Sequence, residues 1–432
     1  MEWIEILVLI VSFFLLLGIG VPVAWTLGIS SLLTLLFSMN SLTAFMTLGQ
    51  QFLVSLDSFT LLAIPFFILA GQMMNKGGIA TRLIHFAKNI VGALPGGLAH
   101  INVVAAMLFG AIAGSSVAAA SAIGSILGPR MEKEGYTKEF GAAINISSST
   151  MGLVIPPSNI LIVYSLASGG TSIAALFIAG YIPGILTGLF LMIVAAVWAK
   201  RKNFPVGERS TFKGLFTSFI AAVPSLLLLI IVIGGIVAGI FTATEAAAIA
   251  VIYTLILAFA YREISVKDLP DILMSSVQTT AIVMLLIAAS ISMSWVFSYG
   301  HIPQNISEAL LSLSDNKIVI LLLINLILLV VGMFMDITPA VLIFTPIFLP
   351  VVLELGIDPV HFGIIMIVNL CIGICTPPVG TLLFVGVSIA GTTIEKVVKP
   401  LLPLFIAMIT ALMLITYWED LSLWLPRLFD LM

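Results

Sequence analysis

Gly152-Leu-Val-Ile-Pro-Pro157 and Gly373-Ile-Cys-Thr-Pro-Pro378 are two stretches of the same form that lie 221 residues apart, from position 152 to position 373. Each lies inside a long apolar segment, where a proline pair removes two N–H donors and breaks a helix. The same offset maps Pro129 onto Pro350. Motifs that recur at one fixed offset indicate an internal repeat. We therefore expect the two halves of the chain to fold alike.

The overall composition is that of a membrane protein. The 432-residue chain is 61% hydrophobic and 9% charged, whereas about 25% of the residues of a soluble domain are charged. Its formal net charge of −3 provides no basic surface for nucleic acid. Cys371 and Cys375 lie in one apolar stretch and indicate neither a disulfide framework nor a zinc site. We predict an all-α polytopic membrane protein in a lipid bilayer, and not an enzyme.

Apolar stretches long enough to cross about 30 Å of hydrocarbon recur along the chain. We predict them at residues 4–37, 59–74, 99–129, 139–166, 173–199, 214–239, 245–261, 273–299, 318–353, 362–388 and 400–418. The first contains Pro22 and is compatible with one span or with two. Stretches 99–129 and 318–353 are long and are interrupted at their centres by small or polar residues, which predicts two re-entrant hairpins.

The basic residues between these stretches predict the orientation, because cytoplasmic loops are enriched in Lys and Arg. Loop 200–213 carries five of them, which places it in the cytoplasm. Arg130, Lys133 and Lys138 follow the first hairpin, whereas loop 354–361 after the second hairpin has no Lys or Arg. Equivalent loops on opposite sides indicate an inverted-topology repeat, which is an architecture of secondary transporters. The same scheme places the C-terminus outside.

The repeat also predicts how the chain is organised. We expect one integral membrane transport domain over residues 1–432, with an amphipathic surface stretch ahead of each hairpin. The predicted parts are a first repeat at about 57–199, a cytoplasmic linker at 200–213 and a second repeat at about 273–418.

The predicted hairpin tips carry polar residues suited to ions. Ser115 and Ser116 lie at the first tip, and Asp336 and Thr338 lie at the second. We predict that Ser115 or Ser116 caps the first half-helix and that Thr338, which precedes Pro339, caps the second. Each tip would then present the positive end of a helix to an anionic substrate. Asp336 is the carboxylate placed deepest in the membrane, and it either helps to bind Na⁺ or only caps its helix.

The proline-pair breaks leave carbonyl groups without donors, and such carbonyls suit a dehydrated Na⁺ ion. Hydroxyl and amide side chains near the breaks are further ligands, namely Ser148, Ser158, Asn159, Thr376 and Thr381. A proline pair also produces simple kinks, and small residues also serve close helix packing. Two copies at equivalent positions favour a site. Glu245 instead fits a capping box with Thr242, which is a structural role. No Gly-x-x-x-x-Gly-Lys-Ser/Thr motif for ATP is present.

Several motifs together resemble one transporter family. They are Asp57-Ser-Phe-Thr-Leu-Leu-Ala-Ile-Pro65, Pro95-Gly-Gly, Gly114-Ser-Ser-Val, Ile155-Pro-Pro-Ser158, Phe241-Thr-x-Thr-Glu245, Met335-Asp-Ile-Thr-Pro339 and Ile374-Cys-Thr-Pro-Pro-Val-Gly380. From about residue 5 to residue 418, the chain resembles the large membrane subunit, DctM, of tripartite ATP-independent periplasmic (TRAP) transporters.

This resemblance implies Na⁺-coupled, elevator-type import of an organic acid across the bacterial inner membrane, with Na⁺ as the coupling ion and no other cofactor. It implies two partners, a small membrane subunit and a periplasmic substrate-binding protein, and no ATPase. The chain begins directly with the large subunit, so we expect the small subunit to be a separate polypeptide. The alternative is a stand-alone Na⁺/anion symporter or an ion antiporter of the same architecture.

The resemblance also implies where the ions and the substrate bind. One sodium site would join the first hairpin tip to the first break, through Ser115, Ser116, Gly152 and Pro156. The other would join the second tip to the second break, through Asp336, Thr338, Gly373, Thr376 and Pro377. The substrate would lie between them, near Ser116, Ser158, Asn159 and Thr381. A dicarboxylate, a sugar acid, a sialate and a keto acid all suit an anion site of this kind.

Overall fold

The computed structural model describes residues 3–202, 204, 211–314 and 316–432 of the chain, and all regular elements within these residues are helices. Within this described part of the chain, eight helices are long and apolar enough to cross a membrane. A ninth span is formed by two pieces, 138–154 and 159–167, that meet at an angle of 52°. This bend lies at the predicted first break. The predicted fold class, an all-α polytopic membrane protein, is confirmed. The middle of loop 200–213, which includes Arg209, lies outside the described residues.

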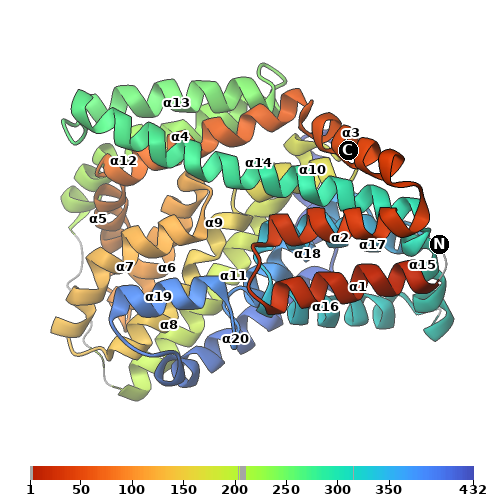
Figure 1. Cartoon of the computed structure of the whole chain (residues 1–432). Coiled ribbons are helices and arrows are strands. Elements are labelled where there is room, and N and C mark those ends of the chain that lie inside the picture. Colours follow the sequence, from red (N-terminus) through yellow and green to blue (C-terminus); the bar gives the residue numbers. More distant parts are fainter. Residues whose placement is uncertain (1–2, 203, 205–210, 315) are drawn as a thin grey trace.

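The N-terminal apolar stretch forms two helices, so it is not one long span. Helices α1 (Trp3–Gly18) and α2 (Val23–Ser38) pack side by side and are joined by a turn in which Gly20 has φ +85°. Helix α3 (Ser41–Leu56), which was not among the predicted stretches, follows and is capped by Asn40. Helices α2 and α3 pack against the long helix α14, and both chain termini lie at the same end of the molecule (Figure 1).

The first half of the chain contains the first hairpin and the first broken helix. After the short turn η1 (Phe59–Leu62), its helices are α4 (Ala63–Lys76), α5 (Ile79–Val91), α6 (Gly97–Ala113), α7 (Ser116–Lys133), α8 (Lys138–Ser149), α9 (Met151–Val154), α10 (Asn159–Ala167) and α11 (Ile173–Lys202). Helices α12 (Phe212–Val237) and α13 (Ala243–Ala260) then lead to the second half. Helices α6 and α7 are the arms of the first hairpin, and α8 to α10 form the first broken helix.

The second half repeats this order. Its helices, after the turn η2 (Val266–Asp268), are α14 (Leu269–Tyr299), α15 (Ile302–Leu313), α16 (Lys317–Phe334), α17 (Ile337–Glu354), α18 (Pro359–Gly373), α19 (Thr381–Ala390), α20 (Ile394–Tyr417) and α21 (Asp420–Leu428). Helices α16 and α17 form the second hairpin, and α18 and α19 form the second broken helix. The C-terminal helix α21 is a further element outside the predicted stretches.

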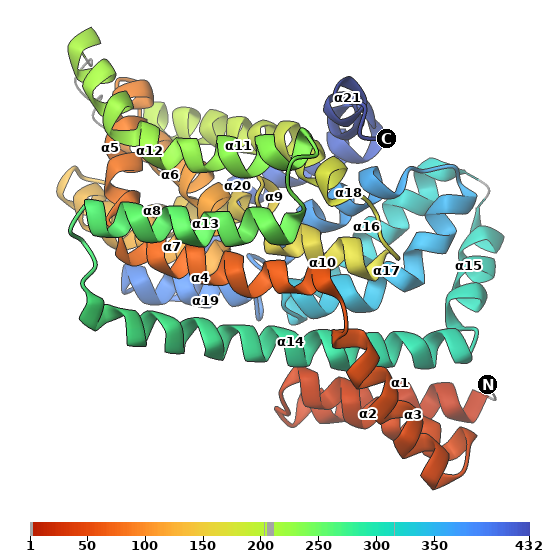
Figure 2. The ribbon, with the colours of Figure 1, turned by 90° about the horizontal axis from the view of Figure 1, so that it is seen from above.

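The two hairpins open toward opposite ends of the molecule. Figure 2 shows the connection from α7 to α8 at the end near α5, and the connection from α17 to α18 at the end near α15. Gly135 and Gly356, which are 221 positions apart, occupy these connections with φ of +90° and +69°. Such positive φ values suit glycine, which has no Cβ. The structure therefore has the inverted arrangement that the loop charges predicted.

The two repeats interlock through their broken helices. Helix α10, the second half of the first broken helix, packs on α17 of the second hairpin. In the same way α19 packs on α7 of the first hairpin. The Tyr164 hydroxyl on α10 donates a hydrogen bond of 2.6 Å to the Pro359 carbonyl at the start of α18. Each hairpin is therefore held by helices from both halves of the chain.

This arrangement predicts the accessibility of two exposed positions, Lys133 at the end of the first hairpin and Glu354 at the end of the second. In whole cells, a membrane-impermeant maleimide should label a Glu354→Cys variant and should leave a Lys133→Cys variant unlabelled. The two native cysteines are buried and give little background. Labelling of both variants from outside would contradict the inverted topology.

Candidate functional site

Each hairpin touches its own broken helix through two glycines. A Cβ atom built on Gly110 of α6 would lie 2.4 Å from the Gly152 Cα, and one built on Gly373 of α18 would lie 2.5 Å from the Gly332 Cα. Both distances are too short for any side chain, so the two backbones are in direct contact. The contact brings the end of each hairpin against the interrupted part of a helix, at equivalent places in the two repeats.

Buried polar side chains reinforce the same contacts. The Ser148 hydroxyl on α8 donates a hydrogen bond of 2.8 Å to Asn102 Oδ1 on α6. In the second repeat, Asn369 Nδ2 on α18 donates to Asn325 Oδ1 on α16 at 2.7 Å. A buried amide needs such a partner, since an unpaired polar group in an apolar interior is costly. Sequence reasoning missed Asn102, Asn325 and Asn369. The available signal was a single asparagine in each of three otherwise apolar stretches, 99–129, 318–353 and 362–388.

The tip of the first hairpin lies beside the first break. Gly114, with φ +59°, forms the turn between α6 and α7, and a Cβ at this position would lie 3.3 Å from the Pro157 carbonyl oxygen. Ser115 then caps α7, because its hydroxyl accepts a hydrogen bond of 3.3 Å from the Ala118 N–H. The predicted cap at this tip is confirmed for Ser115. Ser116 follows as the first residue of the helix and is buried.

The first break leaves one carbonyl group open. Pro156 and Pro157 have no N–H, so the carbonyls of Gly152 and Leu153 lose their helical donors. The Ser158 hydroxyl, which is fully buried, donates a hydrogen bond of 2.6 Å to the Leu153 carbonyl. Within the described residues, no side chain donates a hydrogen bond to the Gly152 carbonyl in the same way. Asn159 Oδ1 is also buried without a hydrogen-bond partner in the described part of the chain. Gly152 and Asn159 therefore supply two unused oxygens beside the first tip.

The second hairpin tip differs from the prediction in its capping residue. Helix α17 begins at Ile337 with Asp336 at the N-cap position, so the expectation that Thr338 is the cap is wrong. Asp is also a preferred N-cap residue, and the extended backbone of Asp336 (φ −70°, ψ 159°) suits that position. Its side chain nevertheless makes no capping hydrogen bond. Asp336 Oδ1 instead accepts a hydrogen bond of 3.4 Å from the hydroxyl of Thr381, and both residues are exposed.

At the second break, more of the backbone carbonyl groups accept hydrogen bonds from backbone N–H groups than at the first break. The Gly373 carbonyl accepts a hydrogen bond from the Thr376 N–H at 2.8 Å, and the Ile374 carbonyl accepts one from the Leu382 N–H at 3.1 Å. The Gly380 N–H donates to the Met333 carbonyl of the hairpin at 3.2 Å. The proline pair of this break ends at Pro378, which is exposed. Its open polar group is therefore the carboxylate of Asp336 rather than a stranded carbonyl.

The substrate residues proposed from the sequence come from neighbouring elements. Asn159 begins α10, Ser116 begins α7 and Thr381 begins α19. Since α19 packs on α7, Thr381 and Ser116 are the first residues of two half-helices that lie side by side. Ser158 is different, because its hydroxyl already bonds the backbone of its own break.

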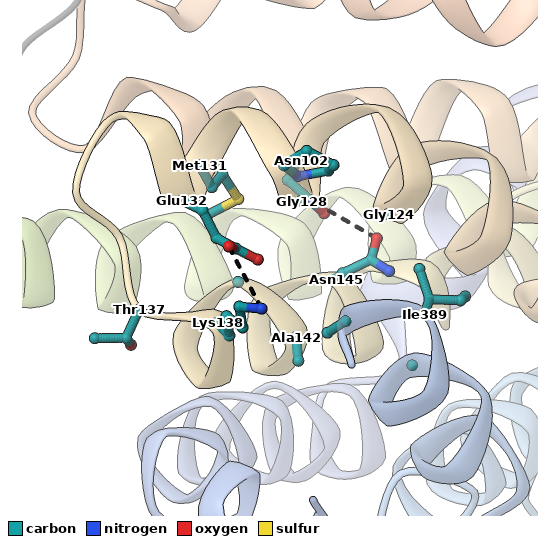
Figure 3. A pocket seen from close by; sticks show the side chains of 14 residues that line it. Asn102, Gly124, Gly128, Met131, Glu132, Thr137, Lys138, Ala142, Asn145 and Ile389 are labelled. Carbon is teal, nitrogen blue, oxygen red and sulfur yellow. Dashed lines mark hydrogen bonds and ion pairs between the residues drawn. The ribbon is translucent and has the colours of Figure 1, made fainter. Parts of the chain in front are cut away.

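A small cavity of about 60 Å³ lies apart from these residues, between α7, α8 and α19. Figure 3 shows Glu132 paired with Lys138 at 3.6 Å, and Asn102 facing Asn145 at 3.5 Å. Much of the remaining wall consists of glycine and alanine. The lining contains no residue of the predicted sodium and substrate sites.

Glu245 has the structural role that the sequence predicts. Its carboxylate accepts hydrogen bonds from the N–H and the hydroxyl of Thr242, at 2.8 and 2.9 Å. The Thr242 hydroxyl in turn accepts a hydrogen bond from the Glu245 N–H at 3.3 Å. The capping box at the start of α13 is complete, so this carboxylate is a natural control for Asp336.

Two hairpins of opposite orientation, each meeting a broken helix where polar groups gather, define a membrane transporter of the inverted-repeat class. A family profile described as "Tripartite ATP-independent periplasmic transporter, DctM component" matches residues 10–421. The chain belongs to this family, as the motifs indicated.

Three relatives illustrate the similarity. The chain is 58% identical to the uncharacterized protein YgiK of Salmonella typhimurium, with 98% of each chain covered. It is 42% identical to the C4-dicarboxylate TRAP transporter large permease protein DctM of Pseudomonas aeruginosa, covering 93% of this chain and 94% of the relative. It is also 42% identical to the isethionate TRAP transporter permease protein DctMQ of Oleidesulfovibrio alaskensis, covering 94% of this chain and 64% of the relative.

A solved structure shares the fold. The crystal structure of the Alcanivorax borkumensis YdaH transporter, described as having an unusual topology, superimposes with a TM-score of 0.65. The match covers 88% of this chain and 89% of that chain at 14% sequence identity. At this identity the comparison supports the arrangement of helices and no further property.

The glycine contacts predict the effect of a single methyl group. A Gly373→Ala substitution should destabilise the protein by about 1–3 kcal/mol, because its Cβ would clash with the backbone of Gly332 and the two helices would have to move apart. The measurement is thermal unfolding of the purified protein. Gly128→Ala on α7 is the matched control, since no atom lies within 4 Å of a Cβ at that position. Equal stability of the two variants would contradict a close backbone contact.

Proposed function

We propose that this protein is the large permease subunit of a Na⁺-coupled importer of an organic acid anion in the bacterial inner membrane. The observation that carries the proposal is the contact of each hairpin tip with a broken helix, once in each repeat. Interrupted helices near the middle of a transporter supply carbonyls for cations and helix N-termini for anions. The inverted order of the two repeats fits alternating access by an elevator movement of the hairpin elements.

The first proposed sodium site lies between Ser115, Ser116 and the break from Gly152 to Pro156. The Gly152 carbonyl has lost its helical donor, and the backbone of Gly152 lies against Gly110 of the hairpin. Oxygen ligands in a buried, preformed site suit a hard cation that has lost its water. The site would therefore bind Na⁺ with neutral oxygens and without a carboxylate.

The second proposed sodium site lies between Asp336, Thr338 and the break that contains Gly373, Thr376 and Pro377. The backbone carbonyls of Gly373 and Ile374 at this break already accept hydrogen bonds. The negative charge of Asp336 would therefore be the main attraction for a cation. Asp336 is exposed and its carboxylate is not used for capping. This carboxylate is available as a cation ligand at the tip, and the hydrogen bond from the Thr381 hydroxyl connects it to the start of α19.

The proposed substrate position lies between these two sites, near Ser116, Ser158, Asn159 and Thr381. The start of α7 presents first-turn N–H groups, which favour an anion. Relatives of this chain are named for C4-dicarboxylate, isethionate, sialic acid and 2,3-diketo-L-gulonate. All are organic acids, and this shared property supports an organic acid anion as the substrate class here.

We propose two protein partners, a small membrane subunit and a periplasmic substrate-binding protein that delivers the anion. The support is the tripartite nature of the family. The isethionate relative is named DctMQ, and this chain covers 64% of its length, so the relative contains a substantial further segment. For this protein we propose that the small subunit is a separate chain, which co-purification with a tagged large subunit would test.

The proposal predicts that transport depends on sodium and on both partners. Proteoliposomes that contain this chain alone, or that lack an inward Na⁺ gradient, should not accumulate a labelled organic acid. Addition of the small subunit and the loaded binding protein should restore uptake. Uptake by the chain alone would instead support a stand-alone Na⁺/anion symporter.

Asp336→Asn tests the second sodium site. Asn caps a helix about as well as Asp, and Asp336 makes no capping bond, so expression and thermal stability should remain near normal. A cation loses a charge-assisted ligand, which should raise the half-saturating Na⁺ concentration severalfold or abolish uptake. The assay is initial uptake rate in proteoliposomes with both partners, over a series of Na⁺ concentrations.

Glu245→Gln is the control for this variant. Gln completes a capping box as Glu does, so the Na⁺ dependence should not change. If Asp336→Asn keeps the normal Na⁺ dependence, the carboxylate has no part in sodium coupling.

A further inference from the structure

A second polar cavity lies far from the hairpin tips, between the amphipathic helix α5 and the first turns of α12. Its volume is about 540 Å³. The polar and basic residues of its lining are Arg82, His85 and Asn89 of α5, and Thr211, Lys213, Thr217 and Ser218 at the start of α12. Its lining comes from α5 and the start of α12, and both elements lie at the end of the molecule where α7 connects to α8 (Figure 2), the end that the basic loops assign to the cytoplasm. It shares no lining residue with the proposed sodium and substrate sites.

Two of the basic side chains in this cavity are free to bind a ligand. The side chains of Lys213 and His85 are exposed and make no hydrogen bond or ion pair with the described residues. Arg82 is already engaged, since it stacks 3.7 Å over the Tyr261 ring and pairs with Glu263 at 3.8 Å. Glu263 is thus the acidic group near this wall, and it is occupied by Arg82. Among the described residues, Lys213 is therefore a cation of this lining that has no acidic partner.

The backbone at the start of α12 adds further donors. Thr211 holds the N-cap position but its side chain makes no capping hydrogen bond. The first N–H groups of a helix have no partner within the helix, and here Lys213 and Gly214 of that turn line the cavity. Free N–H groups at a helix start, together with a lysine and hydroxyl groups, are suited to a phosphate.

An apolar groove adjoins this polar cavity along the same two helices. It has a volume of about 330 Å³ and is lined by Phe86, Ile90, Phe212, Leu215, Phe216 and Phe219. The side chains of Phe212 and Phe216 are 84% and 58% exposed. On α5, Phe86 and Ile90 immediately follow His85 and Asn89, so the apolar and polar linings are adjacent stripes of one helix. A free phosphate or a small soluble anion has no apolar part that could bind in such a groove.

We propose that this surface binds an anionic phospholipid of the cytoplasmic leaflet. The phosphodiester headgroup would lie against Lys213, His85 and the start of α12, and one acyl chain would lie in the Phe86–Phe219 groove. Two observations favour a lipid over other anions. The polar and apolar parts are contiguous, and α12 is one of the helices long and apolar enough to span the membrane. Basic pockets at this level recognise anionic headgroups.

The test is native mass spectrometry of the full-length chain, titrated with phosphatidylglycerol and, separately, with phosphatidylcholine of the same acyl chains. The wild type should retain phosphatidylglycerol severalfold better. Lys213→Gln should weaken this retention about fivefold, the effect of about 1 kcal/mol for one basic residue near an anionic surface. Lys88→Gln is the matched control, because Lys88 is exposed on α5 but does not line the cavity.

Two further measurements distinguish a bound phospholipid from a bound free anion. Phe216→Ser should also lower phosphatidylglycerol retention, whereas millimolar inorganic phosphate should displace little lipid. Full displacement by phosphate, together with an unchanged Phe216→Ser variant, would indicate a site for a free anion and overturn the proposal. Equal retention of the two lipids by the wild type would overturn it as well. Loss of the lipid when the small subunit is co-purified would also overturn the proposal, since the surface would then be a subunit contact.

Discussion

An interrupted helix inside a membrane protein exposes peptide groups that neither lipid nor a regular helix can satisfy. Each unpaired group costs several kcal/mol in hydrocarbon, so such a break survives only where other parts of the protein cover it. In this chain the cover is a hairpin that approaches through Gly110 and Gly152 in one repeat, and through Gly332 and Gly373 in the other. The close backbone contact therefore makes the broken helices possible, and the polar groups of the site depend on it.

The two repeats satisfy the backbone carbonyls at their breaks with different chemical groups. The first break is buried, uses the Ser158 hydroxyl for one carbonyl, and leaves the Gly152 carbonyl without its helical donor at the contact with Gly110 of the hairpin. The second break returns its carbonyls to the backbone and places an exposed carboxylate, Asp336, at the tip. Under the proposed function, one ion would bind in a neutral, enclosed site and the other in a charged, open one. Because α19 packs on α7 and α10 packs on α17, each hairpin is in contact with the broken helix of the other repeat.

Helix α5, at the periphery of the molecule, has two faces that make different contacts. Helix α5 places its apolar face against the first hairpin and its polar face toward Lys213 and the start of α12. A phospholipid bound there would connect the helix that leads into the first hairpin with the cytoplasmic surface of the membrane. The proposed lipid site and the hairpin residues of the first proposed sodium site therefore lie on one continuous segment, α5 to α7.

The sequence by itself determined the membrane class, the two hairpins, the two breaks, their opposite orientation and the capping box of Glu245. These features depend on apolar length, on proline chemistry, on loop charge and on contacts within one helical turn, all of which are local. Only the tertiary structure decided that Asp336 rather than Thr338 holds the N-cap position, and that the Ser158 hydroxyl is used by its own backbone. It also revealed the Asn102–Ser148 and Asn325–Asn369 pairs, and it assigned helices α3 and α21, whose sequences carry no long apolar run. The partners in those polar pairs are about 45 residues apart, and the packing of helices, which no local pattern records, brings them together.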